Sequence, residues 1–231
     1  MCIRDSYSKR YFTLNAAQAE AYDKLRQEYE LEFADGAMVD GQLAIVRLLR
    51  LQQIACGYAV TDHEEEPFRM LGNSNPLLDS CVEVTEALPH QSIIWARFRK
   101  DIDLIIDAVG ADKCVRYDGT LSDDECARSK AAFQAGDKQH FVGNPAKGSE
   151  GLTLLGAKTV QYYNNSFKLK DRLQSEDRPH RIGQDVPVNY IDHDALMPDG
   201  RVTVINKVIR ALRNKFDIAS QINGDVLREW I

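Results

Sequence analysis

The stretch QSEDRPHRIGQ, residues 174–184, contains two arginines three positions apart, Arg178 and Arg181. On a helix these positions lie on one face, so both guanidinium groups would reach toward the same target. A guanidinium stays charged at any working pH, and its fork of donors fits phosphate oxygens. The alternative is a solvated helix end with Gly183 as the terminating residue. The spacing alone therefore indicates either a phosphate site or an ordinary helix terminus.

The sequence around this stretch alternates short apolar runs with helix-forming segments from residue 76 onward. This alternation predicts an α/β fold with a parallel sheet, helices on both faces, and ligands at the carboxyl ends of the strands. The expected strands are residues 92–96, 114–117, 140–143, 159–163 and 188–191, and the expected helices are residues 76–87, 99–109, 123–134 and 168–181. The loops that carry chemistry should therefore follow the strands.

One of these loops is rich in glycine: GNPAKGSEGLTLLGA, residues 143–157. Gly148 and Gly151 would let the backbone approach a ligand closely, and their amides can hold an anion. Taken alone, a loop of this kind is more often a simple turn. The loop therefore has two interpretations, a turn and an anion site.

Two acidic groups resemble metal sites but have simpler explanations. Ser122 and Glu125 have the spacing of a capping box, which accounts for acidic residues at the start of a helix. Asp124 and Glu125 also follow a Gly-Thr-Leu turn and not an apolar strand. His63 and the glutamates at 64–66 lie in a loop, where adjacent side chains have no defined coordination geometry. We therefore predict no metal site.

The segment before residue 75 is expected to be mainly helical. Helices are predicted at residues 13–33, capped by Thr13 or Asn15, and at residues 41–56. An acidic loop at 61–75 follows them. These helices form either an ordinary amphipathic pair or a connector between two lobes of a larger protein.

Bulk composition excludes several classes of protein. The chain has 231 residues, of which 44% are hydrophobic and 28% charged, as in one or two globular domains. A net charge of −6 argues against coating nucleic acid through bulk positive charge. The five cysteines include no C-x-x-C pair, and no apolar run is long enough to span a membrane. We expect a protein of the reducing cytoplasm, without a membrane partner or signal peptide.

The complete string QSEDRPHRIGQ resembles the last signature motif of superfamily-two helicase-like ATPases, in the form typical of the Swi/Snf branch. SIIWARF, residues 92–98, resembles the fourth motif of this family, with Arg97 where the family usually has Gln. The Asp-Gly turn and helix in residues 116–136 also resemble the family pattern. The loop at 143–157 resembles the fifth motif, with a serine in one usual glycine place. Asn-Asn-Ser at 164–166 is closer to phage-encoded members.

The resemblance implies a RecA-like second lobe that binds ATP and DNA. It assigns catalytic roles to Arg178 and Arg181. The nucleotide-binding residues that it implies are Gln174, Glu150 and Gly151, and the DNA-binding residues are Arg97, Lys147, Gly148 and Ser149. ATP and Mg²⁺ are the implied cofactors, with Mg²⁺ held mainly by a first lobe, because this chain contains no G-x-x-x-x-G-K-[ST] loop.

The implied organisation has four parts. They are a foreign or disordered start at 1–6, a helical connector at 7–74, the RecA-like lobe at 75–216 and a helical extension at 217–231. The expected function is half of a DNA translocase, acting on duplex DNA without sequence specificity, inactive alone and completed by a first lobe in cis or in trans. If phage-encoded, it would act in the bacterial cytoplasm. The alternatives are a non-enzymatic module that binds nucleic acid or protein, and an unrelated α/β domain with a fortuitous arginine pair.

Overall fold

The computed structural model describes residues 5–34, 41–61, 64–147, 152, 154–179, 186–221 and 230. It divides into two compact units. The sheet unit comprises Met1–Arg10 and Ser80–His193, and the helical unit comprises Tyr11–Asp79 and Asp194–Ile231. The predicted sites at Glu150, Gly151, Gly148, Ser149 and Arg181, the terminating Gly183, and the loop residue His63 lie outside the described residues.

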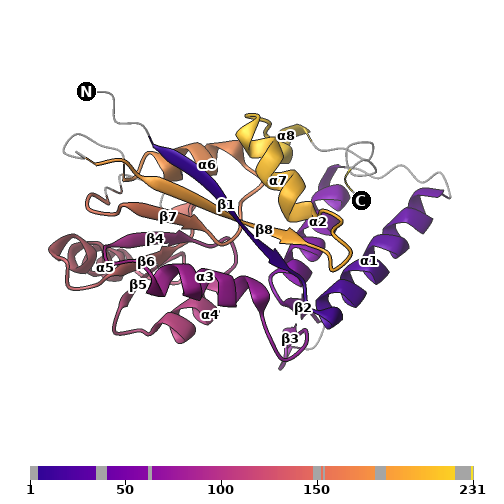
Figure 1. Ribbon diagram of the computed structural model, residues 1–231, viewed down its shortest axis with the longest axis horizontal. Coiled ribbons are helices and arrows are strands. Elements are labelled where there is room, and N and C mark those ends of the chain that lie inside the picture. Colours follow the sequence, from indigo (N-terminus) through magenta and orange to yellow (C-terminus); the bar gives the residue numbers. More distant parts are fainter. Residues whose placement is uncertain are drawn as a thin grey trace. The chain divides into compact units, whose positions relative to one another are not determined.

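A six-stranded sheet in the order β1-β8-β7-β4-β6-β5 forms the centre of the fold (Figure 1). The strands are β1 (Ser6–Thr13), β4 (Ser92–Trp95), β5 (Cys114–Tyr117), β6 (His140–Gly143), β7 (Thr159–Tyr162) and β8 (Asn189–Leu196). Strands β4 to β8 pair in parallel, and Trp95 is level with Gly143 on one side and Tyr162 on the other. The loops that follow these strands therefore start at one edge of the sheet.

Close strand spacing explains one glycine at this edge. A Cβ atom on Gly143 would lie 2.7 Å from the Tyr117 carbonyl oxygen of the neighbouring strand. Since real Cβ atoms do not approach backbone this closely, only glycine fits at the end of β6. The glycine-rich loop thus begins at a position that needs glycine for packing, before any ligand is considered.

Helices cover both faces of the sheet. They are α3 (Pro76–Glu86), α4 (Arg99–Val109), α5 (Asp123–Ala135) and α6 (Leu169–Glu176). Helix α4 carries the chain outward from β4 to β5, while α5 and α6 carry it back, so right-handed crossovers place them on opposite faces. Figure 1 shows α3 and α4 on one side of the sheet and α6 on the other. The predicted RecA-like α/β architecture is confirmed.

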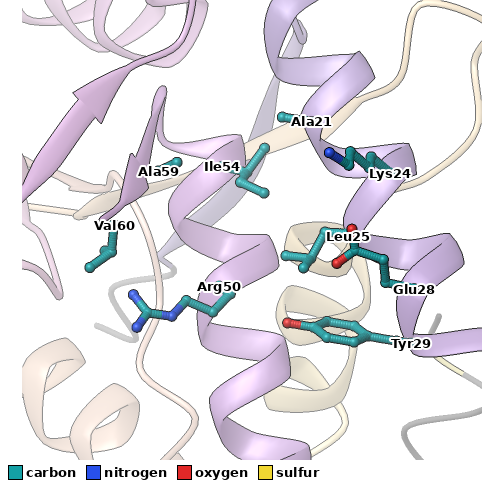
Figure 2. Close-up of a pocket in the computed structure, with 9 residues that line it drawn as sticks. All are labelled: Ala21, Lys24, Leu25, Glu28, Tyr29, Arg50, Ile54, Ala59 and Val60. Atoms are coloured by element: carbon teal, nitrogen blue, oxygen red, sulfur yellow. The ribbon is translucent and has the colours of Figure 1, made fainter. Parts of the chain in front are cut away.

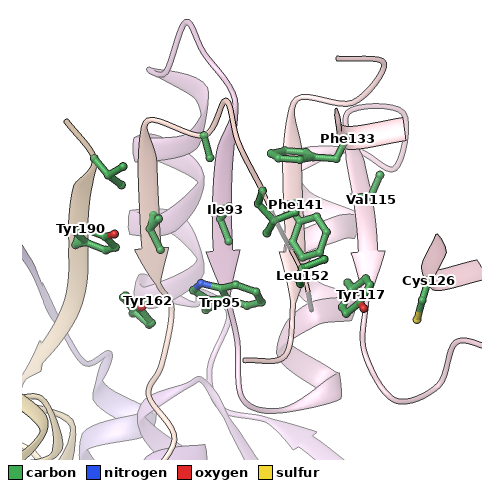
Figure 3. Close-up of a cluster of buried hydrophobic side chains, with 14 residues drawn as sticks. Ile93, Trp95, Val115, Tyr117, Cys126, Phe133, Phe141, Leu152, Tyr162 and Tyr190 are labelled. Atoms are coloured by element: carbon green, nitrogen blue, oxygen red, sulfur yellow. The ribbon is translucent and has the colours of Figure 1, made fainter. Parts of the chain in front are cut away.

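An apolar core fills the face covered by α5 and α6 (Figure 3). The ring of Phe141 lies at its centre, with ring centroids 5.9 Å from Trp95, 5.2 Å from Tyr117 and 5.5 Å from Phe133 of α5. Leu152 and Leu154, from the second half of the glycine-rich loop, belong to the same core. The core thus anchors this segment directly above the sheet.

The opposite face carries a network of buried polar side chains. His193 Nε2 lies 3.0 Å from Gln161 Oε1, and His193 Nδ1 lies 3.1 Å from Ser80 Oγ. Gln161 Nε2 in turn donates to Thr85 Oγ1 of α3 at 2.8 Å. Since Gln161 Oε1 can only accept, the contact assigns the ring proton to His193 Nε2. These hydrogen-bonded side chains join β7 and β8 to α3.

The helical unit contains α1 (Ala16–Ala34), α2 (Gly41–Ala55), β2 (Tyr58–Val60), β3 (Phe68–Met70), α7 (Val204–Arg213) and α8 (Ile218–Gln221). Asn15 caps α1, because its Oδ1 accepts from the Gln18 amide at 2.8 Å and its own amide donates to Gln18 Oε1 at 3.0 Å. The expected loop at 61–75 was wrong in part, since β3 within it pairs antiparallel with β2. Neighbouring strand pairing, not local composition, makes this segment extended.

A pocket of ≈ 420 Å³ lies in the helical unit between α1, α2 and β2 (Figure 2). Leu25 and Ile54 supply apolar lining, and Lys24, Glu28 and Arg50 supply charges of both signs. None of its lining residues belongs to a motif segment. Within the described residues, no helix is both long and apolar enough to cross a membrane.

Candidate nucleotide and nucleic-acid site

Helix α6 carries the final motif, and it ends earlier than the sequence suggested. The expected helix at 168–181 was wrong at its end, because α6 stops at Glu176 and Arg178 lies in the following turn. Pro179 explains the difference, since a residue before proline is disfavoured in the helical conformation. The Tyr190 hydroxyl donates a hydrogen bond to the carbonyl of Glu176 at 2.8 Å, and this bond satisfies a carbonyl at the end of the helix. The argument from helical i and i+3 spacing therefore does not apply to Arg178.

Arg178 is buried, with 5% of its surface exposed, so the interpretation as a solvated helix end was wrong for this arginine. Its Nη1 donates to the Leu152 carbonyl at 3.2 Å. Its own carbonyl accepts from the Leu154 amide at 3.1 Å. Arg178 therefore holds the second half of the glycine-rich loop against the turn after α6. Two motif segments, whose residues Leu152 and Arg178 are 26 positions apart in the sequence, are thus held next to each other.

Gln174 lies on α6, one turn before this arginine, and is half-buried. Its Oε1 is buried and has no hydrogen-bond partner among the residues that the structure describes. An unsatisfied buried acceptor costs about 1–3 kcal/mol, so such atoms usually receive a donor from a ligand, water or another segment. This atom is therefore suited to accept a hydrogen bond from a bound nucleotide.

Arg172, also on α6, is buried, although its place in the sequence beside Lys168 and Lys170 had favoured a solvated helix face. It is 6% exposed, and its guanidinium lies 2.5 Å from Asp192 Oδ1 of β8 and 2.7 Å from Glu176 Oε1. Nη1 also donates to Asn165 Oδ1 at 2.8 Å, and the guanidinium lies 3.5 Å from the centre of the Tyr162 ring. Burial opposes the charge, but its neighbours raise the pKa of Arg172 above its usual value. The side chain therefore stays charged inside the protein.

Arg97 lies in the turn after β4, at the edge where β6 and β7 also end. Its amide donates to Asn164 Oδ1 at 2.6 Å, and its carbonyl accepts from Asn144 Nδ2 at 2.7 Å. Its guanidinium lies 4.1 Å from the centre of the Phe167 ring. Asparagines that follow the strands on either side of β4 thus fix the backbone of Arg97, while its half-exposed side chain stays charged at the edge. We did not predict this role for either asparagine, although each directly follows a predicted strand.

Lys147 is the last described residue of the first part of the glycine-rich loop. Its Nζ lies 3.6 Å from Asp123 Oδ1, and that carboxylate is fully exposed. Exposed ion pairs contribute roughly 0–1 kcal/mol, so a phosphate group can replace this partner at little cost. Lys147 and Arg97 are therefore the described members of the predicted DNA-binding set.

The acidic groups have the structural roles that we predicted from their spacing. Ser122 and Glu125 form a capping box at the start of α5, with both reciprocal hydrogen bonds present. Asp118 closes the Asp-Gly turn by accepting from the Thr120 amide at 2.8 Å. Among the described residues, no group of three or more His, Cys, Asp or Glu side chains could hold a metal ion.

Part of the chain matches a known family model, and several known proteins are similar to it. Residues 75–183 match the model of the helicase conserved C-terminal domain. Transcription regulatory protein SNF2 of Saccharomyces cerevisiae is 30% identical over 112 residues, which are 47% of this chain and 7% of that protein. The curated relatives are much longer proteins, of which the chain spans between 7% and 23%.

Solved structures share the fold over nearly the whole chain. The C-terminal part of the Fun30 ATPase domain has a TM-score of 0.74 and 17% identity, covering 99% of this chain and 96% of that chain. The SWI2/SNF2 ATPase core of Sulfolobus solfataricus in complex with dsDNA has a TM-score of 0.72 and 19% identity, covering 98% of this chain and 50% of that chain. Residues 75–183 thus match the helicase conserved C-terminal domain, and the chain shares the RecA-like fold of these two solved structures.

Proposed function

We propose that the chain is the second lobe of a DNA-dependent ATPase that translocates on duplex DNA. The observation that carries this proposal is the pair of hydrogen bonds from Leu154 to Arg178 and from Arg178 to Leu152. They join the fifth and last motif segments, which in such a motor must respond together to DNA and nucleotide. A first lobe, in cis or in trans, would supply the phosphate-binding loop and most ligands of Mg²⁺.

Arg178 and Arg181 are the proposed catalytic residues. A guanidinium next to the transferred phosphoryl group stabilises the charge that develops there, and one such arginine is worth roughly 10³–10⁵ in rate, or about 4–7 kcal/mol. The contacts of Arg178 leave its charged group close to the motif backbone rather than in bulk solvent. Gln174, Glu150 and Gly151 are proposed to contact the nucleotide, with the buried Gln174 Oε1 as an acceptor.

The DNA-binding residues are proposed to be Arg97, Lys147, Gly148 and Ser149. Contacts of arginine, lysine and backbone amides with phosphate oxygens position a protein on DNA without reading its sequence. Arg97 supports this role because two asparagines fix its backbone while its side chain remains half-exposed. Since the Sulfolobus solfataricus protein with the same fold was solved with dsDNA, duplex DNA is the ligand to test first.

The place of action follows from the same proposal. A lobe of this kind works wherever its DNA lies, and the buried free cysteines at 56, 81, 114 and 126 suit a reducing compartment. We propose the cytoplasm of a bacterial cell, as for a phage-encoded protein. The phage origin remains a prediction from the Asn-Asn-Ser sequence at 164–166.

DNA-stimulated ATP hydrolysis tests this function. The chain would be assayed alone and joined to a first lobe from its natural reading frame, with Arg178→Ala and Arg181→Ala as test variants. Lys170→Ala is the matched control, because Lys170 is an exposed cation on α6, the helix that precedes both arginines. We expect activity only in the joined protein, loss in both arginine variants, and normal turnover in the control.

Two results would overturn the proposal. One is a joined protein that is folded and binds DNA but does not hydrolyse ATP, which would favour a non-enzymatic binding module. The other is turnover that is unchanged in both arginine variants.

A further inference from the structure

The contacts of Arg172 join four parts of the sheet unit. Asp192 belongs to β8, Tyr162 to β7, Asn165 to the loop after β7, and Glu176 to the last turn of α6. A second tie lies one residue past Gln174, where Ser175 Oγ is 2.7 Å from the Tyr162 hydroxyl. Helix α6 is therefore attached to the sheet by directional polar contacts as well as by apolar packing.

The energy of a buried ion pair does not explain why this one is present. Asp192 is fully buried and Arg172 nearly so, and removing two such charges from water costs about as much as their attraction returns. A neutral pair of similar volume would hold the fold equally well. The geometry of the contact is different, because a planar guanidinium can satisfy Asp192, Asn165 and Glu176 in only one orientation. The pair therefore specifies a position rather than adding stability.

We propose that Arg172 is a positioning residue, which together with Asp192 fixes the rotation and depth of α6 on β7 and β8. Gln174 and Arg178 follow Arg172 on the same short segment, so a change in the seating of α6 moves both of them. This inference rests on the proposed function for its consequence in catalysis. The seating of α6 itself does not depend on that function.

The test separates stability from position with a neutral double variant, Arg172→Met with Asp192→Asn. Asn at position 192 can still exchange hydrogen bonds with Asn165, while both charges and the link to α6 are removed. Arg172→Met alone leaves the Asp192 carboxylate buried without its cation. Arg201→Met with Asp23→Asn is the matched control, since this pair is also held by two hydrogen bonds but lies in the helical unit.

The first measurement uses this chain alone and needs no enzymatic activity. Urea unfolding should show a lower midpoint for Arg172→Met and a midpoint near wild type for the neutral double variant. In that double variant, amide hydrogen exchange in α6 should accelerate roughly tenfold or more, while exchange in β4 and β6 stays unchanged. Wild-type exchange in α6 of a stable double variant would overturn the proposal.

The second measurement uses the joined two-lobe protein. A displacement of about 1 Å can cost on the order of a hundredfold in rate, so we expect kcat to fall by that order in the neutral double variant and to stay normal in the Arg201 and Asp23 control. Recovery of kcat together with stability would also overturn the positioning role. If the wild-type joined protein is inactive, the proposed function fails, and the exchange measurement alone still decides the positioning role.

Discussion

The buried His193 should make the stability of the protein depend on pH. His193 is fully buried, its Nε2 donates to Gln161 and its Nδ1 faces Ser80. Burial disfavours the imidazolium and lowers the pKa of His193 to about 4, against the partly opposing charge of Asp192 and with a further lowering by Arg10. In the unfolded chain the pKa of histidine is about 6.5. The unfolded state therefore binds more protons than the folded state between these two values.

The sign and size of the effect follow by linkage. Stability rises with pH wherever the unfolded state binds more protons, so the contribution of His193 is complete above about pH 6.5 and is lost as pH falls toward 4. With 1.36 kcal/mol for each pH unit, the loss from this group reaches about 2 kcal/mol at pH 5 and about 3 kcal/mol at pH 4. Burial also lowers the pKa of His140 to about 4, so the wild-type protein should lose more than this in total.

His193→Gln isolates the contribution of one group. Glutamine keeps a donor and an acceptor for Gln161 and Ser80 but does not titrate, so its cost should be largest at pH 7.5 and should shrink as the pH falls. Urea unfolding at pH 7.5, 6 and 5 measures the free energy of both proteins. A difference between wild type and variant that stays constant over this range would refute the assignment of a buried neutral histidine.

Three further predictions concern the core, a helix cap and the DNA contact. Phe141→Ala should cost about 3–5 kcal/mol in urea unfolding, because Phe141 contacts three aromatic rings at full burial; a loss below about 1 kcal/mol would contradict this packing. Ser122→Ala should cost about 1 kcal/mol by the same measurement, since it removes the cap of α5, whereas an unchanged midpoint would count against the capping box. Arg97→Ala should weaken binding to duplexes of different sequence by a similar factor and reduce the salt dependence of binding, as fluorescence anisotropy can show; a loss confined to one sequence would instead indicate base recognition.

Local sequence predicted the parts of the fold that local rules decide. The strands at 114–117 and 140–143 and the helix at 99–109 were predicted with their observed ends, because apolar runs there are bounded by turn and capping residues. Strand β1 was not predicted. Most of its side chains are exposed, and it is extended because it lies beside β8, where Ser6 contacts Asn189, 183 residues further along the chain. Pairing between distant segments leaves little trace in the local pattern.

The site was predictable in its motif segments but not in its contacts. Arg178 was identified from the string around it, yet its burial depends on Leu152 and Leu154, which precede it by more than twenty residues. Arg172 looked like one cation among several on a helix. Its burial is decided by Asp192, whose place opposite α6 follows only from the order of the strands. The partner of a buried charged residue is therefore found in the folded structure and not among the residues next to it in the sequence.

The central claim, that Arg178 acts on the transferred phosphoryl group, is tested most directly by kcat of the joined two-lobe protein carrying Arg178→Lys. Lysine keeps the positive charge and most of the volume but loses the guanidinium fork. We predict a variant with wild-type urea midpoint and DNA affinity, and a kcat reduced roughly 10³-fold or more. An equally stable Arg178→Lys protein that hydrolyses ATP at the wild-type rate would contradict the account.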